Sequence, residues 1–269
     1  MYRIGSRIYK LLYLDTNAIR EITTDNLGAF NGFLQKFIEN NGAYAPCISI
    51  YIIVEIWSKE SLFRKFLDVF SNIPCFMFFP IQSILSEEYK ADQANQIFNF
   101  CGEVAHAFVP NSIDSNYNIR LFLNNLRVSE VAPAIEKRIQ ELKSTAEIWQ
   151  EQRKVSVQLT EKNYHQYEPY MLKKDLDNFG YTGSINNYEN FPSLRVMEYS
   201  HFNRVHLQNS PITANDVMDV EISYITPYMD AVITEKYQAD VLRKAKMFIP
   251  QLKTLEIYRL KDIRIHATD

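Results

Sequence analysis

A buried strand that ends in a carboxylate is the feature that most constrains this chain. Residues 11–17 read LLYLDTN, an apolar run that closes on Asp15, Thr16 and Asn17. Such a run is typical of a central strand in a parallel sheet, and open α/β sheets bind their ligands at the carboxyl ends of the strands. The pattern therefore places Asp15 at a candidate site. A plain helix N-cap formed by Asp15 or Thr16 is the structural alternative.

The remaining patterns predict an α/β fold. Strands are expected at residues 43–48, 231–234 and 254–260, and 75–81 forms a strand or an interface segment; helices are expected at 26–41, 50–59, 214–226 and 237–247. Strands that alternate with helices form a central parallel sheet with helices on both faces, here a three-layer α/β/α domain.

The middle of the chain has a different pattern from its two ends. Residues 86–158 are expected to be nearly all helix, most clearly at 87–107 and 134–157, and 160–195 to form an irregular or lid-like connection. We therefore expect an α/β domain built from residues 1–85 and 205–269, with a large α-helical insertion at 86–204.

Charge and composition limit the classes of partner. The net charge of -3 and pI of 6.0 give no overall attraction to nucleic acid or membrane, so such binding needs a local patch. The helix expected at 134–157 has interleaved charges of both signs, which is typical of a solvated face. A basic edge formed by Arg138, Lys143, Arg153 and Lys154 is the alternative.

Cysteine usage and hydropathy indicate a cytoplasmic protein. Cys47, Cys75 and Cys101 form no CxxC pair and lie in apolar or helical surroundings, which favours buried free thiols in a reducing compartment. Residues 1–10 lead directly into the first strand without a signal peptide, and the longest apolar stretches are too short to span a bilayer. No membrane partner is expected.

Further acids lie where the predicted fold would bring them near Asp15. Glu55 stands in an apolar helix, where an isolated carboxylate is costly unless it is paired, protonated or bound to a metal. Asp219 lies on the helix expected at 214–226, and Asp230 and Glu235 flank the strand at 231–234. Asp216 forms a capping box with Thr213 and is assigned mainly to that role.

Carboxylates that converge on one sheet edge repel one another. They either raise their pKa values or bind divalent cations, and oxygen ligands without clustered cysteine or histidine favour Mg2+ or Mn2+ over zinc. His201 and His206 are expected to have surface or core roles.

Three segments together resemble the PIN-domain family of metal-dependent nucleases, especially longer PIN-like proteins with a helical insertion. They are LYLDTN, the helix that carries Glu55, and DVMDVEISYITPYMDAVITE, so that the resemblance covers residues 9–70 and 211–262. Asp15, Glu55, Asp219 and Asp230 match the acids of the family. The family often has one or two aspartates after the last of these strands, where this chain has Thr234, Glu235 and Lys236, so the fourth metal ligand is either Asp230 or Glu235.

The resemblance implies a nuclease that hydrolyses phosphodiester bonds, with RNA favoured over DNA and single-stranded RNA as the expected substrate. The implied catalytic residues are Asp15, Glu55, Asp219 and Asp230, which with Glu235 would bind Mg2+ or Mn2+. Asn17 and Thr234 would position the substrate. The family also forms homodimers, and a regulatory protein partner is compatible with it.

Two other functions remain open. The departure at Glu235 and the acidic net charge motivate a catalytically weak or inactive PIN-like module for binding or assembly. A phosphatase of the haloacid-dehalogenase type also begins with a strand that ends in Asp, but that family needs a second Asp where this chain has Asn17.

Overall fold

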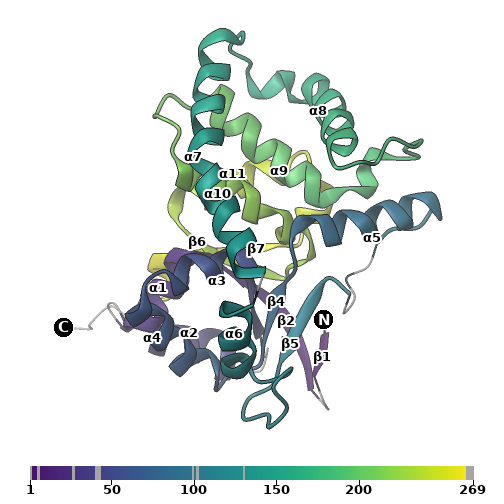
Figure 1. Cartoon of the computed structure of the whole chain (residues 1–269). Coiled ribbons are helices and arrows are strands. Elements are labelled where there is room, and N and C mark those ends of the chain that lie inside the picture. Colours follow the sequence, from purple (N-terminus) through teal and green to yellow (C-terminus); the bar gives the residue numbers. More distant parts are fainter. Residues whose placement is uncertain are drawn as a thin grey trace.

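The computed structural model describes residues 2–4, 7–25, 28–39, 44–98, 100, 103–129 and 131–264 and is an α/β structure (Figure 1). Its strands form one sheet in the order β5-β4-β3-β2-β6-β7, with β1 paired to β2. The bounds of the strands are β1 Tyr2–Ile4, β2 Arg7–Leu14, β3 Tyr44–Ser49, β4 Cys75–Phe78, β5 Ala105–Phe108, β6 Ala231–Thr234 and β7 Glu256–Arg259.

Strand β2 is the centre of this sheet, as the apolar run predicts. It pairs in parallel with β3 on one side and with β6 on the other, so that Leu12 lies between Pro46 and Ala231. The chain proceeds outward from β2 through β3 and β4, and later returns to the other side of β2 as β6 and β7. The carboxyl ends of β2 and β6 therefore lie at a topological switch point, where open α/β sheets leave a crevice.

Helices cover the sheet, and some of them extend away from it (Figure 1). Helix α1 packs against α2, α3 and α4, whereas α9 packs against α5, α10 and α11, an arrangement compatible with three α/β/α layers. Helices α7, α8 and α9 lie together at the top of Figure 1. The α-helices are α1 Thr16–Thr24, α2 Ala29–Phe33, α3 Ile50–Trp57, α4 Glu60–Phe70, α5 Ile81–Gln93, α6 Ile119–Arg127, α7 Val131–Val155, α8 Tyr164–Asn178, α9 Pro192–Phe202, α10 Ala214–Ile222 and α11 Lys236–Ala245.

Shorter helices continue or link these elements. Among the described residues, η2 (Leu34–Glu39) and η5 (Asn203–Leu207) are π-helices, and the second continues α9 directly. The 3-10 helices are η3 Glu161–Asn163, η4 Tyr188–Asn190, η6 Ser223–Tyr228, η7 Pro250–Leu252 and η8 Leu260–Asp262.

Two expectations for the middle of the chain are wrong. The helix expected at 87–107 ends at Gln93, and β5 pairs antiparallel with β4, because the sheet edge at β4 offers a partner for a short apolar segment. The connection expected at 160–195 contains α8, where Tyr164, Leu172 and Leu176 are buried at helical spacing. The range 86–204 thus contributes a strand to the sheet as well as helices.

Several smaller expectations can be compared directly. Cys47 and Cys75 are buried free thiols, as predicted, whereas Cys101 lies outside the described residues. Arg153 on α7 donates to the backbone carbonyls of Val205 and Ser210 at 3.3 and 2.5 Å, so it ties α7 to the segment after α9 and does not form a free basic edge. Across the described ranges, no helix is both long enough and apolar enough to cross a membrane.

A fully buried carboxylate joins α5 to α9 and η6. Oε1 of Glu88 accepts hydrogen bonds from the Ser193 N–H, at 3.0 Å, and from the Tyr228 hydroxyl, while its Oε2 has no hydrogen-bond partner among the described residues. Burial raises the pKa of Glu88 from 4.5 to about 7. The folded protein therefore retains a proton that the unfolded chain loses, and this group's contribution to stability decreases as the pH rises from 4.5 to 7.

We expect Glu88→Gln to remove this pH dependence, because the amide keeps the acceptor and carries no charge. Relative to the native chain, the variant should be nearly neutral at low pH and more stable by about 1–3 kcal/mol at alkaline pH. Thermal unfolding at both pH values measures the difference. Glu87→Gln, which removes an ion pair with Lys90 on the same helix, is the control and should show no such gain. A Glu88→Gln variant that is less stable than the native chain at alkaline pH would contradict the assignment.

Candidate active site

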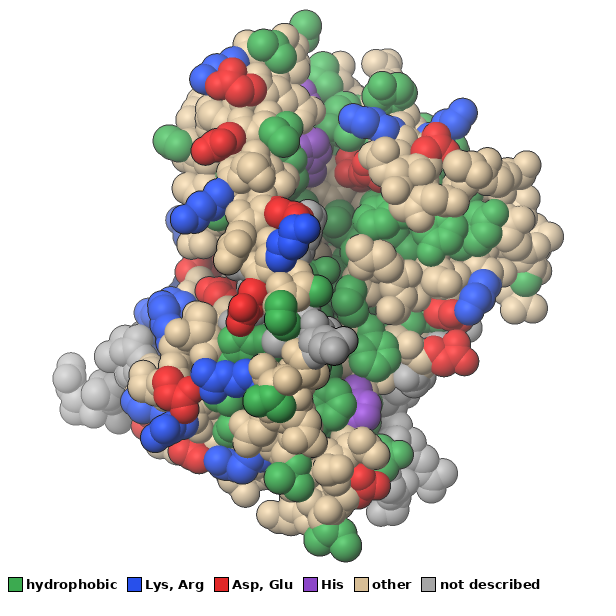
Figure 2. Space-filling view, viewed as in Figure 1, with side chains coloured by type: hydrophobic (Ala, Val, Ile, Leu, Met, Phe, Trp, Pro, Cys, Tyr) green, Lys and Arg blue, Asp and Glu red, His purple; other side chains and the backbone are tan. Residues whose placement is uncertain are grey.

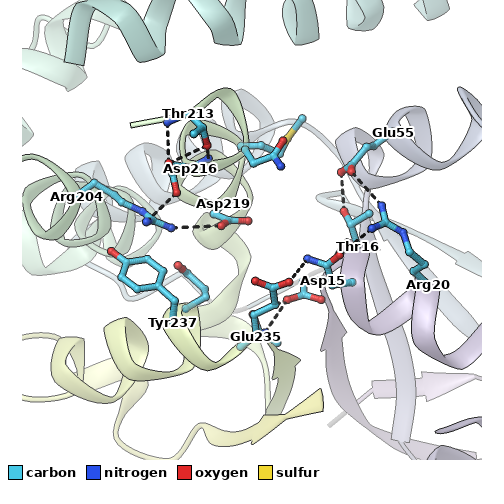
Figure 3. A pocket seen from close by; sticks show the side chains of 15 residues that line it. Asp15, Thr16, Arg20, Glu55, Arg204, Thr213, Asp216, Asp219, Glu235 and Tyr237 are labelled. Carbon is cyan, nitrogen blue, oxygen red and sulfur yellow. Dashed lines mark hydrogen bonds and ion pairs between the residues drawn. The ribbon is translucent and has the colours of Figure 1, made fainter. Parts of the chain in front are cut away.

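Five acids line one cavity beside the switch point, and four of them come from different elements (Figure 3). Asp15 follows β2 and Glu235 follows β6, while Glu55 comes from α3 and Asp219 from α10. The cavity has a volume of about 370 Å³. In Figure 3, Arg204, Asp216 and Asp219 form one wall, Glu55, Thr16 and Arg20 form the other, and Asp15 and Glu235 lie between them.

Asp15 is the most firmly held of these carboxylates. Its Oδ1 accepts from the Ala18 N–H at 2.7 Å, which caps α1, and its Oδ2 accepts from the Thr234 hydroxyl at 2.5 Å and from the Glu235 N–H at 3.1 Å. Asp15 is thus both the N-cap of α1 and a lining residue of the cavity, so the two interpretations of Asp15 do not exclude one another. Burial raises the pKa of Asp15 to about 6, although these hydrogen bonds favour the charged form.

Asp219 faces Asp15 from the neighbouring helix. Burial and then the negative charge of Asp15 raise the pKa of Asp219 to about 8, and the nearby Arg204 opposes this change. The Asp219 side chain keeps 39% of its surface exposed, so this carboxylate lies at the wall of the cavity and not in a closed core. Two adjacent carboxylates whose charged forms are disfavoured are a common property of functional sites.

Glu55 and Glu235 are connected to Asp15 through polar neighbours on α1. The Thr16 hydroxyl donates to Oε2 of Glu55 at 2.7 Å, and the Asn17 amide donates to Oε1 of Glu235 at 2.5 Å. Arg20 donates to Oδ1 of Asn17 at 3.1 Å and lies 3.9 Å from Glu55. In this structure Asn17 and Thr234, which were expected to position a substrate, hold the acids themselves.

Asp230 does not belong to this cavity, and the prediction that placed it with the other acids is wrong. It precedes β6, whereas Asp15 follows β2; since these strands are parallel, the two residues lie at opposite ends of the sheet. Oδ2 of Asp230 accepts from the Leu11 N–H at 2.8 Å and thereby caps the start of the strand pairing. Of the two residues left open as the fourth acid, Glu235 is the one that lines the cavity.

The cavity also contains basic, aromatic and amide side chains that no sequence pattern predicted. Arg204, Tyr237, Gln238 and Arg20 all line it, and Asp216 both completes the capping box with Thr213 and forms an ion pair with Arg204. An arginine inside HFNRVH has no spacing relation to the acids, so no local signal could have identified Arg204. His201 and His206 on the same segment are buried core residues, and burial lowers the pKa of His201 to about 4.

The donor chemistry of the cavity suits a hard cation. Its five carboxylates, those of Asp15, Glu55, Asp216, Asp219 and Glu235, offer oxygen donors, and no cysteine or histidine is among the described residues that line it. Among the residues that the structure describes, no three such side chains are close enough together to form a ready metal site. The carboxylates are instead engaged by Thr16, Asn17 and Arg204, so that metal binding would require these side chains to reorient.

A second feature of the same region is a pair of buried polar groups without partners. The Tyr13 hydroxyl and the Gln238 side-chain nitrogen have no hydrogen-bond partner among the described residues. Both side chains line a small hollow behind the acids, which Asp15, Asp219 and Thr234 also line. A buried polar group without a hydrogen-bond partner lowers the stability of the fold, so two such groups beside the acids are consistent with a functional site.

Comparisons with protein-family models, with curated proteins and with solved structures find no match to this chain.

Proposed function

We propose that this chain is a metal-dependent nuclease with a PIN-like architecture that hydrolyses phosphodiester bonds in single-stranded RNA. The observation that carries the proposal is the convergence of Asp15, Glu55, Asp219 and Glu235 on one cavity at the switch point of the sheet. Fold position, donor type and raised pKa values of Asp15 and Asp219 agree with such a site.

Asp15 and Asp219 would hold Mg2+ or Mn2+, with Glu55 and Glu235 as further oxygen donors. A divalent cation bound here offsets the negative charge of a phosphate and makes a water molecule a better nucleophile. The protein's own contribution is orientation: the hydrogen bonds from Ala18, Thr234 and Glu235 fix Asp15 before any ligand arrives. Glu55 lies at the opposite wall with 37% of its side chain exposed, and it would be either a further oxygen donor or a group that orients a water molecule.

The space around the acids extends beyond one phosphate group. A second cavity, of about 460 Å³, shares Asn17, Arg20 and Glu235 with the first and continues along α1 to Thr24 and Leu260. Two neighbouring cavities of this kind offer room for more than one unit of a polymer. Figure 2 shows acidic and basic side chains interspersed over the visible face, so electrostatic attraction to RNA would have to come from local cations such as Arg20 and Arg204.

Incubation of the purified chain with labelled single-stranded RNA and DNA, in Mg2+, Mn2+ or EDTA, tests the proposal. We expect cleavage of RNA that requires a divalent cation and stops with EDTA. Cleavage that continues in EDTA would contradict the metal requirement. Cleavage of DNA alone would overturn the choice of polymer, which follows from the greater frequency of RNA substrates in the family that the sequence resembles.

A PIN-like binding or assembly module without catalysis is the second candidate. The observation that favours it is that Arg204 and Arg20 already lie beside Asp219 and Glu55, so that protein cations neutralise part of the acidic charge. This candidate predicts no thermal stabilisation by Mn2+, whereas a metal-binding site predicts an increase in melting temperature with Mn2+ concentration.

A further inference from the structure

Arg204 reaches the acidic cavity from η5, on the side opposite Arg20. Its Nη1 lies 2.7 Å from Oδ1 of Asp216, and its Nη2 lies 3.5 Å from Oδ2 of Asp219 (Figure 3). Only 9% of its side chain is exposed. One guanidinium group thus links a capping acid to an acid of the candidate metal site.

The two contacts of Arg204 differ in how firmly they are fixed. Asp216 is held on its other oxygen by the N–H and the hydroxyl of Thr213, at 2.7 and 2.8 Å. The ring of Tyr237 lies against the guanidinium plane, with its centroid 3.6 Å from the guanidinium carbon. The backbone carbonyl of Arg204 accepts a hydrogen bond from Arg153. The longer contact with Asp219 is therefore the one that can be exchanged while Asp216 and Tyr237 keep the guanidinium in place.

We propose that Arg204 is a phosphate-binding residue of this site, which pairs with Asp219 in the metal-free protein and binds a backbone phosphate of RNA once a divalent cation neutralises Asp219. This inference rests on the proposed function. A planar guanidinium presents a fork of N–H donors that matches phosphate oxygens, and a stacked, pre-oriented group loses little entropy on binding. Cation and guanidinium also compete for the same carboxylate, since both are attracted to its negative charge.

Arg20 is less suited to this role. Its side chain is 42% exposed and lies 3.9 Å from Glu55, and its Nη1 donates a hydrogen bond to Asn17. A solvated guanidinium with longer contacts contributes less to geometry than one that is enclosed and stacked. The two arginines therefore predict different effects on substitution, with the larger effect at Arg204.

The test measures Mn2+ binding and RNA cleavage separately, in the full chain. Arg204→Met removes the competing charge, so calorimetric titration with Mn2+ should show affinity increased by about fivefold. The same variant should raise the KM for a single-stranded oligouridylate by about 10- to 100-fold, with a smaller change in kcat, because a charge-assisted contact to phosphate is lost. Arg204→Lys keeps the charge but lacks the fork, so Mn2+ affinity should stay near that of the native chain while the KM rises.

Arg64→Met, which removes an exposed ion pair with Glu60, is the control and should change neither quantity. Arg204→Lys also guards against misfolding, since it retains a cation beside Asp216. An Arg204→Met variant with unchanged or weaker Mn2+ affinity, or with an unchanged KM, would overturn the inference alone. A native chain that neither binds Mn2+ nor cleaves RNA would overturn the proposed function and this inference together.

Discussion

Asp15→Asn should lower metal-dependent RNA cleavage by about 10²–10³-fold, the loss that follows when one group stabilising transition-state charge is removed. The amide lacks the negative charge needed to hold a divalent cation, and it offers one acceptor where the carboxylate uses both oxygens. The fold should persist, because burial already disfavours the charged form of Asp15. Initial rates under saturating Mn2+, with thermal unfolding of the same sample, give the measurement.

Asp230→Asn is the matched control for this substitution. It makes the same chemical change beside the same pair of strands but at the opposite end of the sheet, and its amide oxygen can still accept from the Leu11 N–H. We expect cleavage within about twofold of the native rate, as for a residue that touches neither metal nor substrate. Equal losses in Asp15→Asn and Asp230→Asn would show that the effect arises from the fold and not from the cavity.

Arg195→Met should produce the largest loss of stability, about 3–5 kcal/mol, because it leaves the buried carboxylate of Glu168 without its cation. Arg195 on α9 contacts both oxygens of Glu168 on α8, at 2.8 and 3.3 Å, and also donates to the carbonyl of Phe248 at 2.8 Å. All of these contacts are lost together. The melting temperature should fall on the order of 10 °C, measured by differential scanning calorimetry.

Two further variants separate a buried charge from a general effect of the substitution. Arg120→Met breaks an exposed ion pair with Asp68 and should cost less than about 1 kcal/mol. Adding Glu168→Leu to Arg195→Met removes the unpaired charge and should restore part of the lost stability. A double variant that is less stable than Arg195→Met alone would show that packing, and not the unpaired carboxylate, causes the loss.

The fold was predictable for segments whose structure is determined by their own residues. The run at 11–14 is apolar because β2 is covered on both faces, and the capping box at Thr213 and Asp216 satisfies backbone donors locally. Strand β5 was not predictable in this way, since its four residues gain their partner only when β4 provides an edge. Local periodicity carries no information about such a pairing.

The residues of the site likewise divide into those that local sequence reveals and those that only the folded structure brings in. Asp15 could be located because a strand end is visible in the sequence, and Glu55 because an acid in an apolar helix is unusual. Asp230 was misplaced although the predicted parallel sheet already argued against it. A residue that precedes a parallel strand, as Asp230 precedes β6, lies at the opposite end of the sheet from a residue that follows one, such as Asp15. Arg204 reaches the cavity through side-chain contacts with Asp216 on α10 and Tyr237 on α11, which no motif in the chain encodes.

The proposed function requires the cavity between Asp15 and Asp219 to bind a divalent cation. Crystals of the native chain soaked in Mn2+ and measured for anomalous scattering show whether it does. We predict an anomalous peak bounded by the carboxylates of Asp15 and Asp219, with Arg204 no longer paired to Asp219. The absence of a peak in this cavity at saturating Mn2+, or a peak elsewhere on the chain only, would show that these acids do not form a metal site.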